Sequence, residues 1–175
     1  SLLLEIYCSL GTSRRDARSV ADAFIGVMDG IRGVAVFEPL PANTQQEPKR
    51  IAETGDVWLS YEAGTAHRVS AGSFFQVNRF LIETLVGLVS KGEKGQLALD
   101  LYAGVGLFSQ ALAQSFAQVI AVEPSQTSYH DLRHNAVSEV KAVRATTEQY
   151  LAGASLPGAD LIVVDPPRGG LGENV

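Results

Sequence analysis

From about residue 71 onward, apolar segments of strand length alternate with segments of helical periodicity. The two clearest apolar runs, 119–122 and 161–164, contain no polar residue. Such runs are typical of strands in a parallel sheet that is covered on both faces, because neither face then meets water. Alternation with helices favours crossover connections between parallel strands. We therefore predict an α/β domain with a doubly wound sheet over residues 71–175.

The same periodicity places the elements of this domain. Helices are predicted over 79–89, 107–114 and 126–137, and strands over 97–102, 118–122 and 161–164. The first 70 residues follow a different pattern. We expect a strand at 2–7, then a helix that is capped by Gly11-Thr12-Ser13 and ended by Gly30, and then a strand at 31–37. A proline-containing loop is expected at 39–50, followed by a hairpin of 57–61 with 66–70. Residues 1–70 are thus predicted to be a separate, small α+β domain.

Composition excludes several classes of protein. In 175 residues, 46% are apolar and 19% are charged, which supports a folded core and excludes disorder. With Cys8 alone and only three histidines, neither a disulfide framework nor a zinc site is expected, and a reducing cytoplasm is the default compartment. No apolar stretch approaches the roughly 20 residues of a membrane-spanning helix. The net charge of −5 argues by itself against a polyanionic partner.

A glycine turn after the strand at 97–102 points to a cofactor. Gly104 and Gly106 permit close approach of a ligand to the backbone, and a helix begins directly behind them. Glu123, at the end of the next predicted strand, could accept both hydroxyls of an adenosine ribose. Dinucleotides and S-adenosylmethionine both use this arrangement. Because Ser109 stands where the dinucleotide fingerprint has its third glycine, we favour S-adenosylmethionine.

A second motif follows the apolar run at 161–164. Asp165-Pro166-Pro167-Arg168 stands at the carboxyl end of this predicted strand, and ligands bind at such ends in open α/β sheets. The two prolines have fixed φ and lack an N–H donor, so they stiffen the loop that presents Asp165. In isolation the segment could equally be a turn that ends a strand.

Four motifs in this order resemble the RNA (uracil-5-)-methyltransferases, over about residues 55–171. They are Phe-Phe-Gln-x-Asn from Phe74, Asp-Leu-Tyr-x-Gly-x-Gly-x-Phe-Ser from Asp100, Glu-Pro at Glu123, and Asp-Pro-Pro-Arg-x-Gly from Asp165. The resemblance implies a Rossmann-like class I methyltransferase sheet, C-terminally truncated here, with S-adenosylmethionine as cofactor. No metal is expected in this segment, because its cysteine and histidines form no metal-binding pattern. The implied cofactor contacts are Gln76, Tyr102, Gly104, Gly106, Leu107, Glu123 and Asp165, the two glycines through backbone near the methionine portion.

The resemblance also implies the reaction, which is methylation of carbon 5 of a uridine in tRNA or rRNA. Carbon 5 is a poor nucleophile, so the family first adds a cysteine thiolate to carbon 6, and a general base later removes the carbon 5 proton. In the family both residues lie further along the chain than the Asp-Pro-Pro-Arg strand. We therefore expect no catalytic residue within residues 1–175 and an inactive fragment. Cys8, without a neighbouring cation in sequence, is expected to be structural.

Three alternatives remain open at this point. The chain could belong to a class I methyltransferase that acts on a small molecule or a protein, which the negative charge would suit better. It could also be a nicotinamide-dependent oxidoreductase, against which Ser109 and the Asp165 motif count. The third alternative is a cofactor-binding module without catalysis. Arg14, Arg15 and Arg18 could contact phosphate, although a solvated helix face is the more frequent explanation of such a run.

Overall fold

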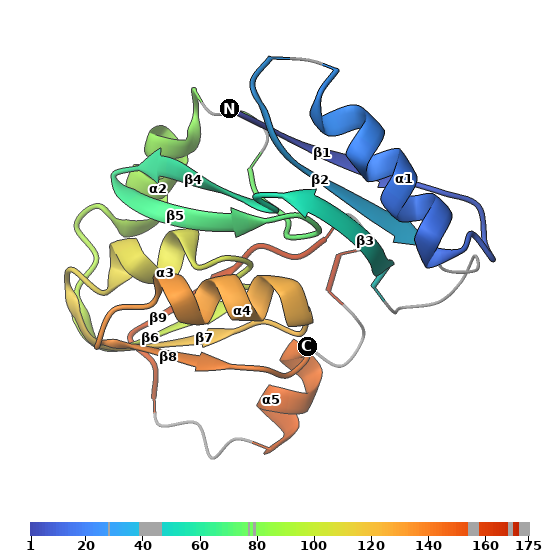
Figure 1. Ribbon diagram of the computed structural model, residues 1–175. Coiled ribbons are helices and arrows are strands. Elements are labelled where there is room, and N and C mark those ends of the chain that lie inside the picture. The colour runs from blue at the N-terminus through green and yellow to red at the C-terminus, as the bar shows by residue number, and fades with distance from the viewer. Residues whose placement is uncertain are drawn as a thin grey trace. The chain divides into compact units, whose positions relative to one another are not determined.

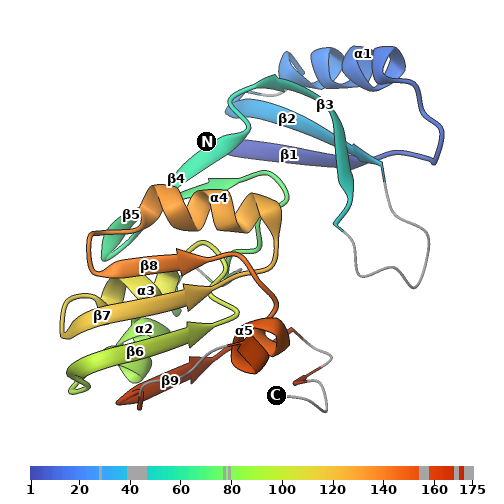
Figure 2. The same ribbon diagram turned by 90° about the horizontal axis from the view of Figure 1, so that it is seen from below.

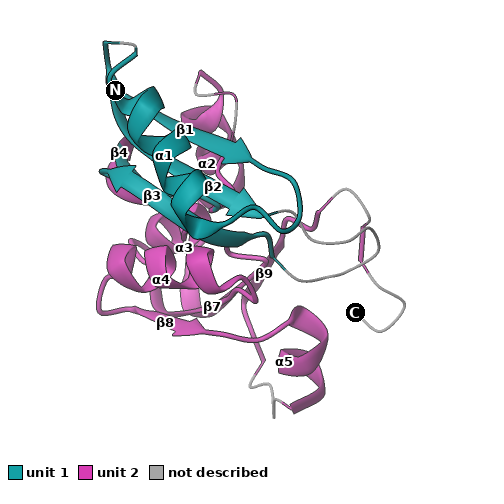
Figure 3. Cartoon of the chain, turned by 45° about the vertical axis from the view of Figure 1, so that its right-hand side comes forward, with its two compact units in different colours: residues 1–60, 70–72 teal, residues 61–69, 73–175 magenta. Residues whose placement is uncertain are grey.

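The computed structural model describes residues 1–27, 29–38, 47–76, 78, 80–153, 158–167 and 170–171. The chain divides into two compact units, one formed by residues 1–60 with 70–72 and the other by residues 61–69 with 73–175 (Figure 3). Within the described residues, no helix is long and apolar enough to span a membrane.

The first unit is a three-stranded sheet with one helix. Strands β1 (Leu2–Tyr7), β2 (Ile31–Glu38) and β3 (Lys49–Gly55) lie in that order, with β1 parallel and β3 antiparallel to β2. Helix α1 (Arg14–Ile25) connects the two parallel strands (Figure 1). It buries Ala17 and Ala21 against Val34 and Val36. The predicted α+β character of this region is therefore confirmed for the described residues.

Two predictions for the first unit need correction. Helix α1 ends at Ile25 with Gly26 as its C-cap, about one turn before the predicted stop at Gly30. A turn in which the Val27 N–H donates to Phe24 O follows it, and Met28 lies outside the described residues. The predicted loop at 39–50 is also too long, because β3 already begins at Lys49. Residues 39–46 lie outside the described residues.

The second unit contains a four-stranded parallel sheet. Its strands are β6 (Gly95–Leu101), β7 (Phe116–Val122), β8 (Val140–Val143) and β9 (Leu161–Val164), and Figure 2 shows them side by side in the order β8, β7, β6, β9. Every adjacent pair in this sheet is parallel. Since the chain leaves β6 toward β7 on one side and returns to β9 on the other, the sheet is doubly wound. The predicted α/β class is confirmed.

Helices cover the two faces of this sheet unequally (Figure 1). On one face, α2 (Ile82–Ser90), α3 (Leu107–Leu112) and α4 (Gln126–Asn135) pack around a core that includes Phe108, Leu112 and Leu132. On the other face, the helix among the described residues that contributes side chains to the apolar cluster is α5 (Thr147–Gly153). Ile162 and Val164 of β9 remain 52% and 39% exposed. The prediction of full cover on both faces is therefore wrong for β9 in the described structure.

Periodicity missed two elements of this unit and displaced others. Strand β8 is only four residues long and includes Lys141, so it does not form an apolar run. Helix α5 begins with a capping box in which Thr146 and Gln149 exchange side-chain to backbone hydrogen bonds of 3.1 and 3.2 Å. Strands β6 and β7 each begin two residues earlier than predicted, and α2 begins at Ile82 instead of residue 79.

The predicted hairpin forms, but most of it belongs to the second unit. Strands β4 (Trp58–Ala63) and β5 (Thr65–Ser70) make a two-stranded sheet joined by Gly64. Ala63 packs in a cluster with Ile82 and Leu107, and the Thr65 hydroxyl donates to Gln110 Oε1 at 2.6 Å. These contacts explain why residues 61–69 group with the α/β sheet, whereas the sequence suggests a boundary near residue 70.

The unequal packing gives a direct test of where the second unit is stabilised. Leu112→Ala removes a fully buried side chain from the three-helix face and should lower the free energy of unfolding by about 2–5 kcal/mol. Leu88→Ala, the same substitution at a site that is 79% exposed, should change it by less than about 0.5 kcal/mol. Urea denaturation of both variants measures the difference, and equal effects would contradict this packing.

Candidate cofactor-binding site

The register of the parallel strands brings three predicted site residues to one edge of the sheet. Leu101 of β6 pairs with Val122 of β7 and with Val164 of β9. The next residue along each strand is Tyr102, Glu123 and Asp165, respectively. These three residues therefore begin the loops at the carboxyl edge, on both sides of the point where strand order reverses, which is where open α/β sheets bind ligands.

The backbone after β6 turns sharply. Gly104 and Gly106 have φ of 56° and 93°, and Tyr102 has φ of 67°, the one positive value among described non-glycine residues. Glycine at 106 is favoured by its positive φ, and a Cβ there would also displace the end of the Leu132 side chain, whose Cδ1 would lie 2.8 Å away. A left-handed tyrosine stores strain of about 1–3 kcal/mol, and such strain concentrates at functional sites.

Glu123 holds this turn against the sheet. The side chain is buried, with Oε2 accepting the Gly104 N–H and Oε1 accepting the Ser125 N–H, both at 2.8 Å. Both carboxylate oxygens thus accept backbone N–H groups, one from the turn after β6 and one from the loop after β7. The sequence placed Glu123 as a ribose acceptor, and the structure adds that it positions the glycine turn.

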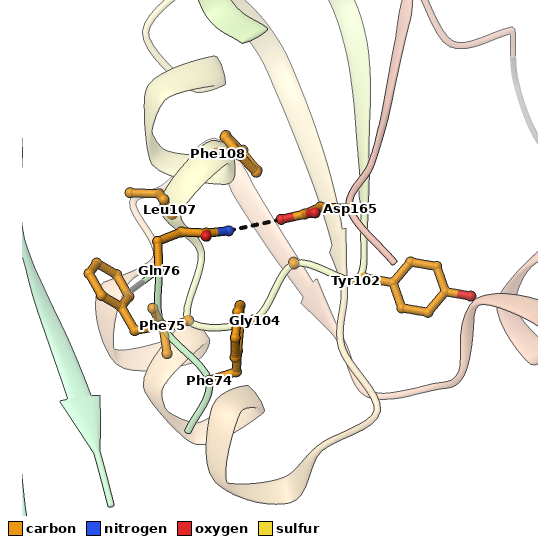
Figure 4. Close-up of a pocket in the computed structure, with 10 residues that line it drawn as sticks. Phe74, Phe75, Gln76, Tyr102, Gly104, Leu107, Phe108 and Asp165 are labelled. Carbon is orange, nitrogen blue, oxygen red and sulfur yellow. Dashed lines mark hydrogen bonds between the residues drawn. The ribbon is translucent and has the colours of Figure 1, made fainter. Parts of the chain in front are cut away.

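An open pocket lies over the turn (Figure 4), with about 320 Å³ of empty space including solvent at its mouth. Gln76, Tyr102, Gly104, Leu107 and Asp165, all predicted to contact the cofactor, line it; the predicted Gly106 and Glu123 do not. Gln76 Nε2 donates to Asp165 Oδ2 at 3.0 Å. In Figure 4 the Tyr102 ring points away from this pair, and it packs on the apolar cluster of α5.

Aromatic side chains that we did not assign to the site form part of the pocket wall. Phe74, Phe75 and Phe108 line it together with the predicted residues. Phe75 is held by Tyr61 of β4, with ring centroids 4.8 Å apart, whereas Phe74 is 65% exposed. The signal was present in the sequence, because Phe74 and Phe75 directly precede Gln76, but an aromatic pair is more often part of a core.

Beneath the turn, a fully buried acid joins β6 to α3. Ser109 Oγ donates to Asp100 Oδ2 at 2.5 Å. Burial raises the pKa of Asp100 to about 7, against the opposing effect of the Ser109 hydrogen bonds, with the carboxylates of Asp165 and Glu123 adding a smaller upward contribution. Ser109 is the residue that replaces the third glycine of the dinucleotide fingerprint. A glycine there could not make this bond, so Ser109 has a structural role at this position.

The remaining candidates are exposed or have structural contacts. Cys8 is half-buried, and its thiol donates to Phe37 O at 3.2 Å. His67 is 1% exposed, with Nδ1 2.9 Å from Thr65 O, and burial lowers its pKa. Arg14, Arg15 and Arg18 are exposed on α1, as are His130 and His134 on α4. Among the described residues, no group of three or more His, Cys, Asp or Glu is arranged to hold a metal ion.

Comparison with protein families identifies the chain. Residues 61–175 match the family model described as tRNA (Uracil-5-)-methyltransferase. This match begins at the first residue of the second unit and includes the glycine turn, Glu123 and Asp165. The chain therefore belongs to the tRNA (uracil-5-)-methyltransferase family.

Individual relatives agree with this assignment. An uncharacterized RNA methyltransferase of Streptomyces avermitilis is 40% identical over 118 residues, covering 63% of this chain and 27% of that protein. The 23S rRNA (uracil(747)-C(5))-methyltransferase of Pyrococcus horikoshii is 36% identical over 143 residues, covering 79% of this chain and 34% of that protein. The chain thus spans about a quarter to a third of the curated relatives that it matches.

A solved structure shares the fold. The Pyrococcus abyssi tRNA (uracil-54, C5)-methyltransferase, determined in complex with S-adenosyl-L-homocysteine, superposes with a TM-score of 0.62 at 23% identity. The superposition covers 82% of this chain and 37% of that chain. The likeness supports the predicted Rossmann-like class I methyltransferase fold.

The raised pKa of Asp100 predicts how the free energy of unfolding changes with pH. Between the ordinary value of 3.8 and about 7, the folded chain keeps a proton that the unfolded chain releases, so stability falls as pH rises through this window. Asp100→Asn removes the group that holds this proton. The pH-dependent loss of unfolding free energy, at most about 1.4 kcal/mol per pH unit, should therefore disappear in the variant. Urea denaturation of both proteins at about pH 4.5, 5.5 and 6.5 measures it. Parallel stability curves would show that Asp100 does not titrate there.

Proposed function

We propose that this chain is the cofactor-binding part of an S-adenosylmethionine-dependent RNA methyltransferase that modifies carbon 5 of uridine. The observation that carries the cofactor proposal is the convergence of the glycine turn, Glu123 and Asp165 at one sheet edge, which follows from the pairing of β6 with β7 and β9. When bound, the cofactor supplies the methyl group. Family membership supports the reaction class.

The residues at this edge suit the chemical groups of S-adenosylmethionine. The buried Glu123 carboxylate offers only hydrogen-bond acceptors at this edge, which suits the two ribose hydroxyls. The backbone at Gly104 lines the pocket without a side chain and leaves space there for the methionine portion, and the positive φ of Gly106 continues the same turn. The residues of the site are therefore chemically compatible with this cofactor.

Other residues of the pocket orient the ligand and exclude water. Gln76 and Asp165 offer an amide and a carboxylate from opposite walls, and their mutual hydrogen bond holds both side chains toward the pocket. Leu107 and the neighbouring phenylalanines supply apolar surface that displaces water from the reacting groups. Tyr102 contributes its strained backbone at the start of the turn, while its ring faces the α5 side.

For the complete protein we propose a uridine in tRNA or rRNA as substrate. Relatives carry names that specify uracil-C5 methylation of 23S rRNA and of tRNA. The reaction needs a thiolate that adds to carbon 6 and a base that removes the carbon 5 proton. Cys8, the chain's single cysteine, has a thiol that donates to a backbone carbonyl, so we place the nucleophile beyond residue 175 and expect residues 1–175 to bind cofactor without turnover.

The cofactor proposal is tested by isothermal titration of the chain with S-adenosylhomocysteine, with NAD as the competing ligand. We expect one binding site for S-adenosylhomocysteine and no heat from NAD. Binding of NAD alone would overturn the proposed function in favour of an oxidoreductase. Absence of binding by either ligand would contradict the proposal that residues 1–175 hold the cofactor.

Glu123→Ala provides a residue-level test of the same proposal. The substitution removes the proposed ribose acceptor and leaves the Gly104 N–H without its partner, so affinity for S-adenosylhomocysteine should fall by about 1–3 kcal/mol. Glu139→Ala is the matched control, because it removes the same charge from an exposed site just before the amino end of β8. Calorimetry that gives equal affinities for the two variants would remove Glu123 from the site.

A further inference from the structure

The last residue of α4, Asn135, makes three hydrogen bonds with backbone. Asn135 Oδ1 accepts the Arg68 N–H at 2.8 Å, and Nδ2 donates to Arg68 O at 3.0 Å and to Val105 O at 2.9 Å. Both N–H groups of the carboxamide are therefore used. Val105 lies between Gly104 and Gly106, so one side chain connects strand β5 with the middle of the glycine turn.

One helical turn earlier, Asp131 makes a parallel set of contacts. Its buried carboxylate accepts the Ser73 hydroxyl at Oδ2, at 2.7 Å, and pairs through Oδ1 with Arg68 Nε at 3.3 Å. Ser73 directly precedes the pocket residues Phe74, Phe75 and Gln76. Residues at i and i+4 of α4 thus hold two separate segments of the pocket wall on one helix face.

The bond to Val105 has a specific consequence for the turn. A peptide between flexible residues can rotate as a unit, and Gly106 places little steric restriction on the Val105–Gly106 peptide. Here that peptide is held at both ends, because the Gly106 N–H donates to Ala103 O at 2.9 Å and Val105 O accepts from Asn135. Losing the Asn135 bond would leave the carbonyl end of the peptide without its side-chain partner.

We propose that Asn135 is a positioning residue of the cofactor site, acting through the Val105–Gly106 peptide and without touching the ligand. This proposal rests on the proposed function for its ligand. Asn135 is half-buried at the end of α4 and does not line the pocket. Its effect on affinity is therefore indirect, through the shape of the turn that the ligand meets.

The test compares Asn135→Ala with Thr65→Val in the whole 175-residue chain. Thr65→Val breaks the Thr65–Gln110 hydrogen bond, which also connects β5 to the rest of the second unit but does not involve the glycine turn. The unfolding free energy of both variants is measured first, so that their losses of stability can be compared. Calorimetric titration with S-adenosylhomocysteine and amide hydrogen exchange of Gly106, followed by NMR, are then recorded for both.

A positioning role predicts an affinity loss in Asn135→Ala of roughly tenfold, or ~1.4 kcal/mol, beyond any change in Thr65→Val. It also predicts faster exchange of the Gly106 amide in Asn135→Ala only. Affinity that falls in proportion to stability in both variants, or that is unchanged in Asn135→Ala, would overturn the proposal. If the wild-type chain does not bind S-adenosylhomocysteine, the proposed function fails. Separately, unchanged exchange of the Gly106 amide in Asn135→Ala would overturn the role of Asn135 in the turn.

A second variant tests the same proposal if Asn135→Ala does not fold. Asn135→Asp keeps the size and the acceptor for the Arg68 N–H, but as a carboxylate it cannot donate to Val105 O. Protonation restores one donor, so affinity relative to wild type should recover as pH is lowered. A ratio of affinities that is independent of pH would contradict the proposed bond to Val105.

Discussion

The pairing of β6 with β7 on one side and β9 on the other is the constraint on which the site depends. Because Leu101 pairs with both Val122 and Val164, the loops after these three strands begin at the same level. A shift of β9 by one residue would turn every side chain of that strand to the opposite face and displace Asp165 from Gln76. The pocket is thus a consequence of strand register.

The turn that follows β6 combines strain with hydrogen bonds from its surroundings. Tyr102, Gly104 and Gly106 have positive φ, and Glu123 and Asn135 hold the backbone between them. The Asp100–Ser109 bond anchors the start of α3 below the same turn. Because contacts from the ends of β7 and α4 and from β6 hold the turn, its conformation is preorganised. Little conformational entropy therefore remains to be lost when a ligand binds.

The sequence predicted the elements whose pattern is local and missed those that depend on distant contacts. The apolar runs of β7 and β9 predicted buried parallel strands, and the positions of Gly104, Glu123 and Asp165 predicted the edge at which they meet. Four-residue β8 has no distinctive periodicity, and the attachment of β5 to the second unit depends on Thr65, Arg68 and Asn135, whose partners lie 30 or more residues away. The partial exposure of β9 likewise reflects which helices pack nearby, which no local pattern specifies.

We propose that a ligand binds where the register brings these loops together. The most direct measurement is a titration of the isotopically labelled chain with S-adenosylhomocysteine, followed by NMR through backbone amide shifts. We predict that the largest changes in amide shift fall on residues 102–106, Glu123 and Asp165, with smaller changes in the first unit, including α1. No shifts, or shifts concentrated away from the carboxyl edge of the sheet, would contradict a binding site at this edge.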